Sequence, residues 1–501
     1  MEFAVSQTKR VTSALGLLAA LSVWFCCGCA SQPSFPLPIE ARVENWETVF
    51  AFDTDRDQRA DFWQYQRADG RKHAVAYADE QSGQPGQRIE LDDVDASECP
   101  HFMIVLDGVP FELVDQLYNE GHFRLFHRPA RVICCYPAMT DLALSELFHV
   151  GPCLAYQARY FDRQANRFTD GNAVYLSGQN SPWLALMDYR CSFWWDALAY
   201  LDPQAVFNHE LNGIVGTFRK IDTGEAYAYT VATAGLGTRG GREAIRAYLR
   251  VIDRLCEQII YERRGHVHLT LIADHGHNMV ENERISFRQT LESGGYRQAK
   301  SLRKPGDVVP VAYGLVTYAA FFTDDPAGVA ECLLRHEDVE FACYPVDDAV
   351  VVRDRAGEAR ITRGDSGFVY DSSKGDPLKF AAILQRLRAA GKISTEGEID
   401  ANALFEATLD HTYPDPLARV WGAFHGLVEH PPDLIVNLRD GACYGSRFFH
   451  AMIGRVGSTH GSLNRASSTT FVLTTLGELP SAMRSCDVLP RLEGLWARTA
   501  D

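Results

Sequence analysis

Hydrophobic runs and polar breaks alternate along most of this chain in the manner of α/β proteins. Residues 101–109, HFMIVLDGV, form a short apolar run that ends in Asp and Gly, which predicts a buried strand. Residues 241–265 instead place Ile and Leu at helical spacing and close with two arginines and a glycine, which predicts a helix. A second apolar run, 267–276, follows at once. A helix that leads directly into a strand ending in Asp274 predicts an α/β sheet with polar residues at its strand ends.

The pattern changes again in the second half of the chain. Residues 341–371 show short alternating runs separated by Gly and Asp turns, which indicates an inserted β-containing subdomain over 301–375. Helical and strand-like segments then resume. We therefore expect a central, mostly parallel sheet flanked by helices. Its two parts would be residues 99–300 and 376–501, with the β-containing subdomain between them.

Residues 1–29 have the character of an export signal. Lys9 and Arg10 precede an apolar segment that is too short for a comfortable membrane span and that ends at Cys29. A small residue before the cysteine resembles a bacterial lipoprotein signal with Cys29 as the lipidated residue, although Cys26 stands where leucine is usual. An ordinary secretory signal and an uncleaved anchor are the alternatives. The lipoprotein interpretation places the protein in the bacterial cell envelope, anchored to a membrane by lipid and facing the periplasm or the surface.

Residues 30–98 combine a Pro-rich tether with an acidic, repeat-like segment. Four aspartates fall at positions 1, 3, 5 and 9 of a calcium-loop-like pattern: Asp53, Asp55, Asp57 and Asp61. Gln58 stands where the turn of such a loop needs glycine, and Gln64 stands where calcium needs a bidentate glutamate. A solvated acidic turn is therefore the interpretation we favour over a calcium site.

The charge and the cysteine spacing of the chain exclude several classes of partner and site. The chain has 501 residues and a formal net charge of -16, and no long basic run is present. We expect no nucleic-acid partner, because phosphate backbones require patches of Lys and Arg. A small phosphate-bearing substrate remains compatible with this charge, since a bound metal reverses the local field. The cysteines beyond the signal form no CxxC pair, which excludes zinc-ribbon and thioredoxin sites.

Four fragments carry residue types suited to metal and phosphate chemistry. They are Asp107 at a predicted strand end, Thr140 before an apolar-periodic helix, Asp274-His275-Gly276 at the next strand end, and His460 in STHGSL. Each alone has an ordinary explanation: an Asp-Gly pair is usually a turn, and a Thr before a helix is usually an N-cap. Their order and spacing together resemble the alkaline phosphatase superfamily over residues 100 to 475. The nearest branch is the nucleotide pyrophosphatase/phosphodiesterase type.

This resemblance implies a nucleophile and a metal site. In that family a Thr or Ser hydroxyl attacks phosphorus, while a metal lowers the pKa of the hydroxyl and neutralises the phosphoryl oxygens. Thr140 would be the nucleophile, and Asp107, Thr140, Asp274 and His275 would bind the metal. A helix N-terminus at Thr140 would also offer N–H groups to the phosphate, so capping and catalysis are compatible. Carboxylate and imidazole ligands suit zinc, with manganese as the alternative.

The second metal site of the family departs from the pattern in this chain. Its ligands are an Asp and a His four residues apart, together with a late histidine that corresponds to His460. Ala234 and Thr238 stand where the Asp and the His are expected, and residues 226–241 contain no Asp, Glu or His. The sequence therefore favours one metal ion over two, with His460 left as a single ligand, a hydrogen-bonding partner or a phosphate contact.

Two arginines in the same Gly-rich segment are candidates for substrate binding. Arg239 and Arg242 could place a guanidinium where the second metal would lie, and exposed, solvated arginines are the ordinary alternative. The asparagine that holds the phosphoryl oxygen in this branch is not evident, and Arg159 and Tyr160 lie near its place.

Three functions stay open on sequence alone. The first is an exported, membrane-anchored, metal-dependent hydrolase of phosphate mono- or diesters that uses a Thr nucleophile and a small phosphate-ester substrate. The second is a catalytically degraded protein of the same fold that binds a ligand or an envelope partner. The third is transfer of the phosphoryl group to an acceptor other than water.

Overall fold

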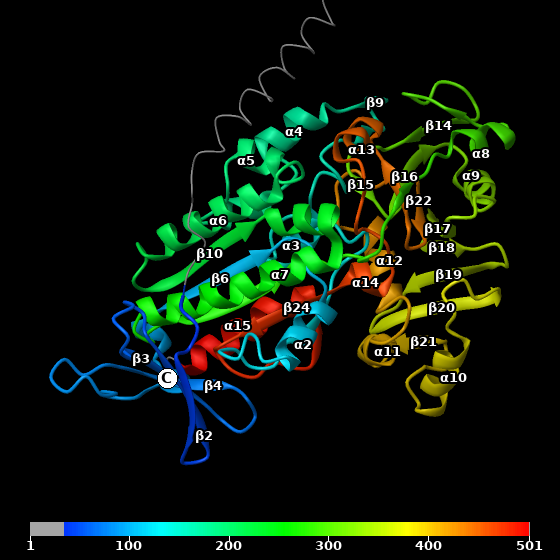
Figure 1. The fold of residues 1–501 in the computed structure, drawn as a ribbon. Helices are drawn as coiled ribbons and strands as arrows, with labels where there is room; N and C mark the ends of the chain where they lie inside the picture. Colours follow the sequence, from blue (N-terminus) through cyan, green and yellow to red (C-terminus); the bar gives the residue numbers. More distant parts are fainter. Residues whose placement is uncertain (1–34, 500–501) are drawn as a thin grey trace, which may run out of the picture.

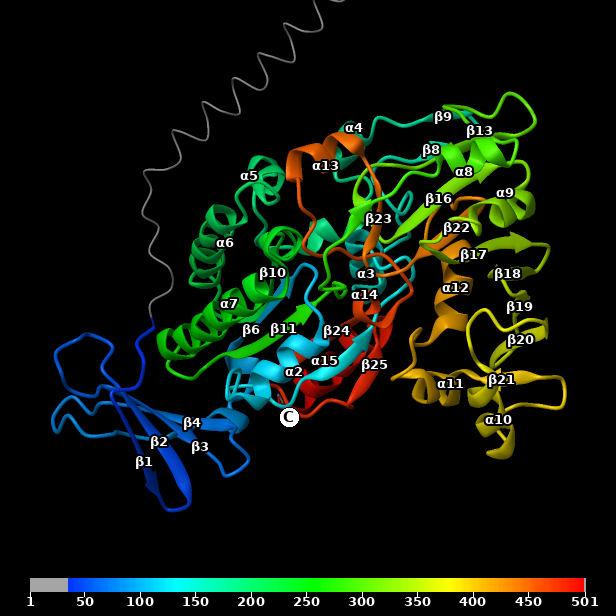
Figure 2. The same ribbon diagram turned by 45° about the vertical axis from the view of Figure 1, so that its right-hand side comes forward.

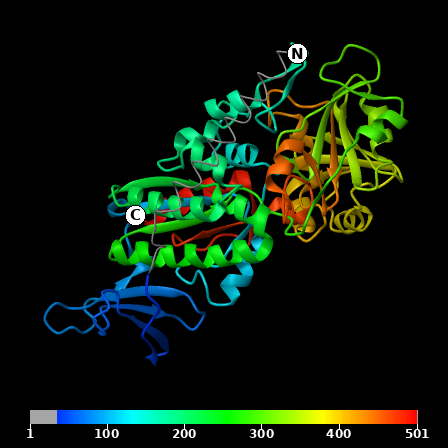
Figure 3. The same cartoon turned by 45° about the horizontal axis from the view of Figure 1, so that its top comes forward.

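A computed structural model describes residues 35–499, so the predicted signal at 1–29, with Cys29, lies outside the described residues. Figure 1 shows three bodies of β structure: an N-terminal sheet, a central sheet covered by helices, and a larger second sheet. The N-terminal sheet and the second sheet lie at opposite ends of the molecule (Figure 3). Within residues 35–499, no helix is both long and apolar enough to cross a membrane.

The central sheet has six strands in the order β10-β6-β11-β24-β7-β25. Their bounds are β6 Pro100–Leu106, β7 Ala130–Ile133, β10 Gly224–Thr230, β11 His268–Ala273, β24 Thr469–Thr474 and β25 Ala482–Arg484. Strand β24 pairs antiparallel with both of its neighbours, β11 and β7. The other pairings are parallel, so five of the six strands run in one direction. The predicted central, mostly parallel sheet is confirmed.

Helices pack around this sheet (Figures 1 and 2). They are α2 Phe111–Asn119, α3 Thr140–Leu147, α6 Pro203–Phe218, α7 Ala232–Glu262 and α15 Ser485–Thr499. The long helix α7 contacts α6 and α2, whereas α3 contacts α15. The segment between α3 and α6 carries the short elements β8 Phe161–Asp162, β9 Arg167–Phe168, α4 Gly171–Ser177 and α5 Phe193–Leu198.

The long helix begins earlier than the sequence predicts. The Gly-rich stretch before residue 241 lies outside the helix predicted over 241–265, but it is helical from Ala232 up to a break at Gly241, where φ is 61° and ψ is -151°. Close packing explains this, because a Cβ at Gly235 would lie 1.9 Å from the carbonyl oxygen of Ala199. Tertiary contact thus overrides the low helix propensity of glycine.

The second sheet has nine strands in the order β13-β14-β16-β22-β17-β18-β19-β20-β21. Their bounds are β13 Arg297–Gln298, β14 Asp307–Pro310, β16 Tyr318–Thr323, β17 Val339–Val346, β18 Ala349–Arg353, β19 Glu358–Arg363, β20 Gly367–Lys374, β21 Glu398–Asp400 and β22 Leu434–Leu438. Strand β22 comes from the C-terminal part of the chain and inserts between β16 and β17. The β-rich middle region is therefore closed by a strand that lies far away in sequence.

Short elements connect the second sheet to the central one. Helices α8 Arg288–Ser293, α9 Pro326–Leu333, α10 Ala381–Ala389, α11 Ala401–Thr408 and α12 Pro416–Phe424 accompany the second sheet. A three-stranded sheet of β12 Glu283–Arg284, β15 Leu315–Val316 and β23 Ala442–Gly445 precedes α13 Arg447–Ile453 and α14 Arg465–Ser468. The loop 454–464 between α13 and α14 bonds to the three-stranded sheet through Thr459, whose Oγ1 donates to the carbonyl oxygen of Leu315 in β15 at 2.6 Å.

The N-terminal sheet was not expected from the sequence. Its five antiparallel strands are β1 Glu40–Glu44, β2 Glu47–Phe52, β3 Phe62–Gln66, β4 Lys72–Tyr77 and β5 Ile89–Glu90. The acidic segment is the loop between β2 and β3. Asp53 accepts hydrogen bonds there from the backbone N–H groups of Asp57 and Gln58, and Asp61 accepts one from Thr54 N at 3.0 Å. These carboxylates therefore close the turn itself.

Candidate active site and metal centre

The sheet topology brings three predicted site residues to one edge of the central sheet. Strands β6 and β11 are adjacent and parallel, and their register pairs Leu106 with Ala273. Asp107 and Asp274 are the next residues of the two strands, so both acids leave the sheet side by side, and His275 follows Asp274. Carboxyl ends of adjacent parallel strands are the usual place for a site in an α/β sheet.

Four side-chain atoms, which we call the four-atom cluster, lie around one point. Thr140 Oγ1 is 3.4 Å from Asp107 Oδ1 and 3.2 Å from His275 Nε2. His275 Nε2 is in turn 3.7 Å from Asp107 Oδ1 and 3.2 Å from Asp274 Oδ2. Ligand atoms at zinc-binding distance in a tetrahedral site lie roughly 3.3 Å apart. These four separations are close to those between the ligand atoms of a tetrahedral metal site.

Each carboxylate is fixed through one oxygen. Asp274 Oδ1 accepts hydrogen bonds from Gly108 N at 2.9 Å and from His275 N at 2.8 Å. Asp107 Oδ2 accepts one from the hydroxyl of Tyr229 at 2.6 Å. The second oxygen of Asp274 is buried and has no hydrogen-bond partner within residues 35–499. A buried, unpaired carboxylate oxygen is costly, and one that faces three other donor atoms fits a cation.

The electrostatics of the cluster also suit a cation. Burial raises the pKa of Asp107 well above its usual value, and the neighbouring Asp274 raises it further, against the opposing hydrogen bond from Tyr229. Burial raises the pKa of Asp274 to about 6. Two carboxylates that cannot both ionise cheaply in a buried site are stabilised when a divalent cation neutralises them. The residues present therefore fit the metal that the sequence resemblance implies.

His275 presents the correct nitrogen to the cluster. Its Nδ1 lies 3.0 Å from the carbonyl oxygen of Gly276, which can only accept a hydrogen bond. Nδ1 therefore carries the proton, and Nε2 keeps a free lone pair directed at Thr140 and the two acids. Burial lowers the pKa of His275 to about 4, so the ring is neutral at physiological pH.

Thr140 is the accessible member of the four-atom cluster. It is the first residue of α3, and Met139 occupies the N-cap position, so the N-cap interpretation of Thr140 is wrong by one residue. Thr140 is partly exposed whereas Asp107, Asp274 and His275 are buried. A reactant can therefore approach Thr140 from solvent, at the helix end where backbone N–H groups have no intrahelical acceptor.

His460 joins the site from a distant loop. Its ring stacks on His275 with centroids 3.9 Å apart, and its Nδ1 lies 2.7 Å from the carbonyl oxygen of Ala138. The arginines proposed for substrate binding are exposed and bond elsewhere. Arg239 donates to Tyr200 O at 3.2 Å, and Arg242 donates to Gln116 Oε1 at 3.1 Å.

The two residues near the place of the missing asparagine also make other contacts. The guanidinium of Arg159 lies over the ring of Phe168, and Tyr160 stacks on His430. Ala234 and Thr238 are buried in the first turns of α7. Thr238 contributes its carbonyl oxygen to the fold, because it accepts a hydrogen bond from Gly457 N at 2.6 Å.

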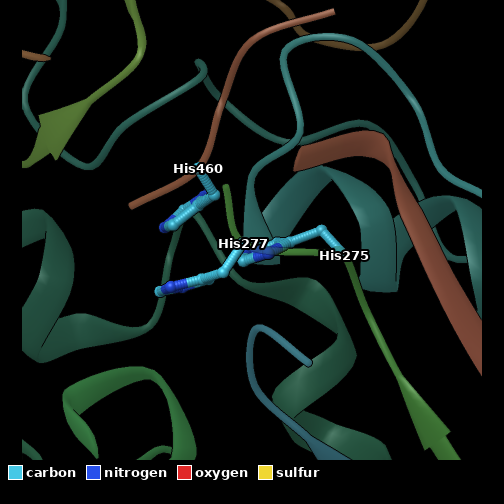
Figure 4. Close-up of side chains that lie close together, drawn as sticks. All are labelled: His275, His277 and His460. Atoms are coloured by element: carbon cyan, nitrogen blue, oxygen red, sulfur yellow. The ribbon is translucent and has the colours of Figure 1, made fainter. Parts of the chain in front are cut away.

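One histidine in the cluster was not singled out in the sequence. His277 is fully buried, and its ring lies 5.1 Å from that of His460 and 6.0 Å from that of His275. Figure 4 shows the three rings gathered together with nearly parallel planes. The signal in the sequence was the spacing, since residues two apart in an extended segment point to the same side.

Comparisons with known proteins give similarities of structure. No protein-family model matches the chain, and no curated protein matches it in sequence. Phosphonoacetate hydrolase from Sinorhizobium meliloti 1021 matches with 12% identity and a TM-score of 0.42, over 83% of this chain and 97% of that one. Human ectonucleotide pyrophosphatase/phosphodiesterase 5 matches with 11% identity and a TM-score of 0.43, over 79% of this chain and 94% of that one.

The second of these proteins bears the name of the type that the sequence motifs resemble.

Proposed function

We propose that the protein is an exported, membrane-anchored, metal-dependent hydrolase of phosphate mono- or diesters with Thr140 as its nucleophile. The single observation that carries the proposal is the four-atom cluster, in which the hydroxyl of the partly exposed Thr140 lies 3.2 Å from His275 Nε2 and 3.4 Å from Asp107 Oδ1. The export and lipid anchor are supported by the sequence of residues 1–29 alone.

Asp107, Thr140, Asp274 and His275 would hold a divalent ion, with zinc favoured by the imidazole and carboxylate ligands. Such an ion, when bound, lowers the pKa of an attached hydroxyl and neutralises the phosphoryl oxygens. Other residues of the chain hold these ligand side chains in place. Tyr229 holds Asp107 by one oxygen, Gly108 N holds Asp274 by one oxygen, and Gly276 O fixes the tautomer of His275. These contacts leave the ligand atoms preorganised.

The reaction would proceed in two steps. Thr140 Oγ1 gives up its proton to solvent and forms a bond to phosphorus while the ester P–O bond breaks, and the leaving alkoxide takes a proton from solvent to become the alcohol. Water then forms a bond to the same phosphorus, the Oγ1–P bond breaks, and the hydroxyl of Thr140 regains a proton as the phosphate product leaves. An acceptor alcohol in place of water would give transfer from the same intermediate.

Turnover of small nitrophenyl esters tests the proposal. Zinc- or manganese-loaded protein should release nitrophenol from nitrophenyl phosphate or bis-nitrophenyl phosphate. Thr140→Ala should lose at least 100-fold in kcat, since no other hydroxyl replaces Oγ1. Thr140→Ser, which keeps a hydroxyl, is the matched variant and should retain part of the activity.

One observation favours the second candidate function, a catalytically degraded protein that binds a ligand. Ala234 and Thr238 are buried side chains that supply no imidazole or carboxylate to the site. In that case Thr140→Ala and the parent protein would release nitrophenol at the same background rate, although both bind zinc. Equal rates in the two proteins would therefore overturn the hydrolase proposal and leave the metal site intact.

A further inference from the structure

His277 has a free nitrogen lone pair inside the protein. Its Nδ1 lies 2.7 Å from Ser458 Oγ, and the Ser458 hydroxyl donates its only hydrogen to Gly237 O at 3.0 Å. Ser458 Oγ must therefore accept from His277 Nδ1–H, which leaves the lone pair on Nε2. This Nε2 is buried and has no hydrogen-bond partner in the described part of the chain. Buried nitrogen acceptors without a partner are rare and require an explanation.

His460 also has its Nδ1 fixed by a hydrogen bond and a lone pair on Nε2. Its Nδ1 lies 2.7 Å from the carbonyl oxygen of Ala138, so Nδ1 carries the proton and Nε2 carries the lone pair. One ring nitrogen each of His275, His277 and His460 lie within 4.8 Å of one another. Metal-binding histidines almost always have their other nitrogen fixed by such an outer contact, and both rings meet that condition.

The backbone keeps space open in front of His277. Gly108 has a φ of +69°, and a Cβ built on it would lie 2.5 Å from His277 Nε2. Any side chain at this position would therefore fill the space in front of the lone pair. Gly237 makes a similar close approach on the other side, where a Cβ would lie 3.1 Å from His277 Nδ1.

His275 Nε2 belongs to the four-atom cluster, whereas the Nε2 of His460 does not. His275 and His460 stack with centroids 3.9 Å apart and planes 17° apart. His275 Nε2 already lies within 3.7 Å of three oxygen atoms of the four-atom cluster. His460 is therefore available to His277, whose ring is 5.1 Å away and tilted by 26°.

We propose that His277 and His460 bind a second divalent metal ion next to the four-atom cluster. His277 would supply the imidazole that Thr238 does not, from a different segment of the chain. Two nitrogen ligands would leave positions for water or a phosphoryl oxygen, and imidazole suits zinc, copper or nickel. The catalytic use of this ion rests on the proposed function, whereas its binding does not.

Metal content per chain tests the inference directly. Protein saturated with zinc and dialysed should hold two equivalents by elemental analysis. His277→Ala and His460→Ala should each hold one. His101→Ala removes an equally buried histidine that bonds to Thr270 and Glu225, outside the site, and should keep two.

A milder substitution distinguishes the loss of a metal ligand from a folding defect. Ser458→Ala leaves His277 in place and removes only the group that fixes its Nδ1, so the affinity for the second equivalent should fall about 10- to 100-fold while the first is unchanged. Cobalt titration gives an independent readout, because two four-coordinate sites should produce two successive rises in visible absorbance and His277→Ala only one.

Three results would overturn the inference. One equivalent in the parent protein that persists in His277→Ala would mean that His277 binds nothing. One equivalent that disappears in His277→Ala would place a single ion on the three histidines. If Ser458→Ala binds the second equivalent of zinc with the parental affinity, Ser458 does not position His277 for metal binding. Two equivalents without any ester cleavage would support this inference and contradict only the proposed function.

Discussion

Asp274 shows how one side chain holds the backbone and faces the site at once. Its Oδ1 accepts two backbone hydrogen bonds, from Gly108 and His275, and its Oδ2 is left without a partner in the described residues. An acid directly after a buried apolar run was visible in the sequence, as were Asp107 and Thr140. The sequence could not show which oxygen is free, because that depends on how the neighbouring strand end folds against it.

Asp274→Asn separates these two roles. Asparagine keeps an oxygen for the two backbone N–H groups and replaces the free oxygen with an amide nitrogen, which has no lone pair for a metal. It also removes a buried charge beside Asp107. We expect the unfolding free energy of the metal-free protein at pH 8 to rise by on the order of 1 kcal/mol. The increase in Tm on adding zinc should disappear.

Thermal unfolding with and without zinc measures both effects. The matched control is Asp141→Asn, since Asp141 accepts hydrogen bonds from Asn180, Ser181 and Trp183 and not from the residues of the four-atom cluster. Asp141→Asn should keep the zinc-dependent rise. A zinc-dependent rise of parental size in Asp274→Asn would rule out Asp274 as a ligand.

His277 marks the limit of residue-level prediction. His277 lies two positions after His275, a spacing that places side chains on the same side of an extended segment. The motif that carries the family resemblance, however, assigns no role to position 277. Its partners, Ser458 and Gly237, are 181 and 40 positions away in the chain and become its neighbours only in the folded protein.

At the scale of elements, strands were predicted better than helix ends. The apolar runs at 101–109 and 267–276 correspond to β6 and β11. The start of α7 was not predictable, because its glycines have low helix propensity and are tolerated through a contact with Ala199. The N-terminal sheet was missed for a different reason: β1, EARVE, has no buried residue, so it lacks a clear alternating pattern.

Strand β11 carries a pH-dependent contribution to stability. His268 is buried, its Nε2 lies 3.0 Å from Val94 O, and burial lowers its pKa from 6.5 to about 4. The unfolded chain therefore binds a proton between pH 6.5 and 4 that the folded chain does not. The unfolding free energy should fall as the pH drops through this window, by about 3 kcal/mol at most from this group.

Denaturant unfolding at several pH values between 7 and 4 measures this slope. His268→Gln cannot take up the proton, so its unfolding free energy should fall less steeply with pH than that of the parent protein. The neighbouring His266 is exposed, and His266→Gln should leave the slope unchanged. Equal slopes in His268→Gln and the parent would show that His268 does not contribute.

At the scale of the whole molecule, the site lies where the two large sheets are joined. Asp107, Asp274 and His275 leave the central sheet, while His460 comes from the loop 454–464, whose Thr459 bonds to Leu315 beside the second sheet. In the central sheet, β6 and β11 were predictable as strands because each is an apolar run that is complete in the local sequence. The insertion of β22 between β16 and β17 was not, because the strand and its neighbours are separated by more than sixty positions.

Crystals grown with zinc and measured at the zinc absorption edge would locate the metal. We predict an anomalous peak within bonding distance of Asp107 Oδ1, Thr140 Oγ1, Asp274 Oδ2 and His275 Nε2, the four atoms with separations close to those of a tetrahedral site. A second peak between His277 and His460 would add the other ion. No peak among the four atoms, or a peak only at the histidine pair, would contradict the metal site on which the proposed hydrolase depends.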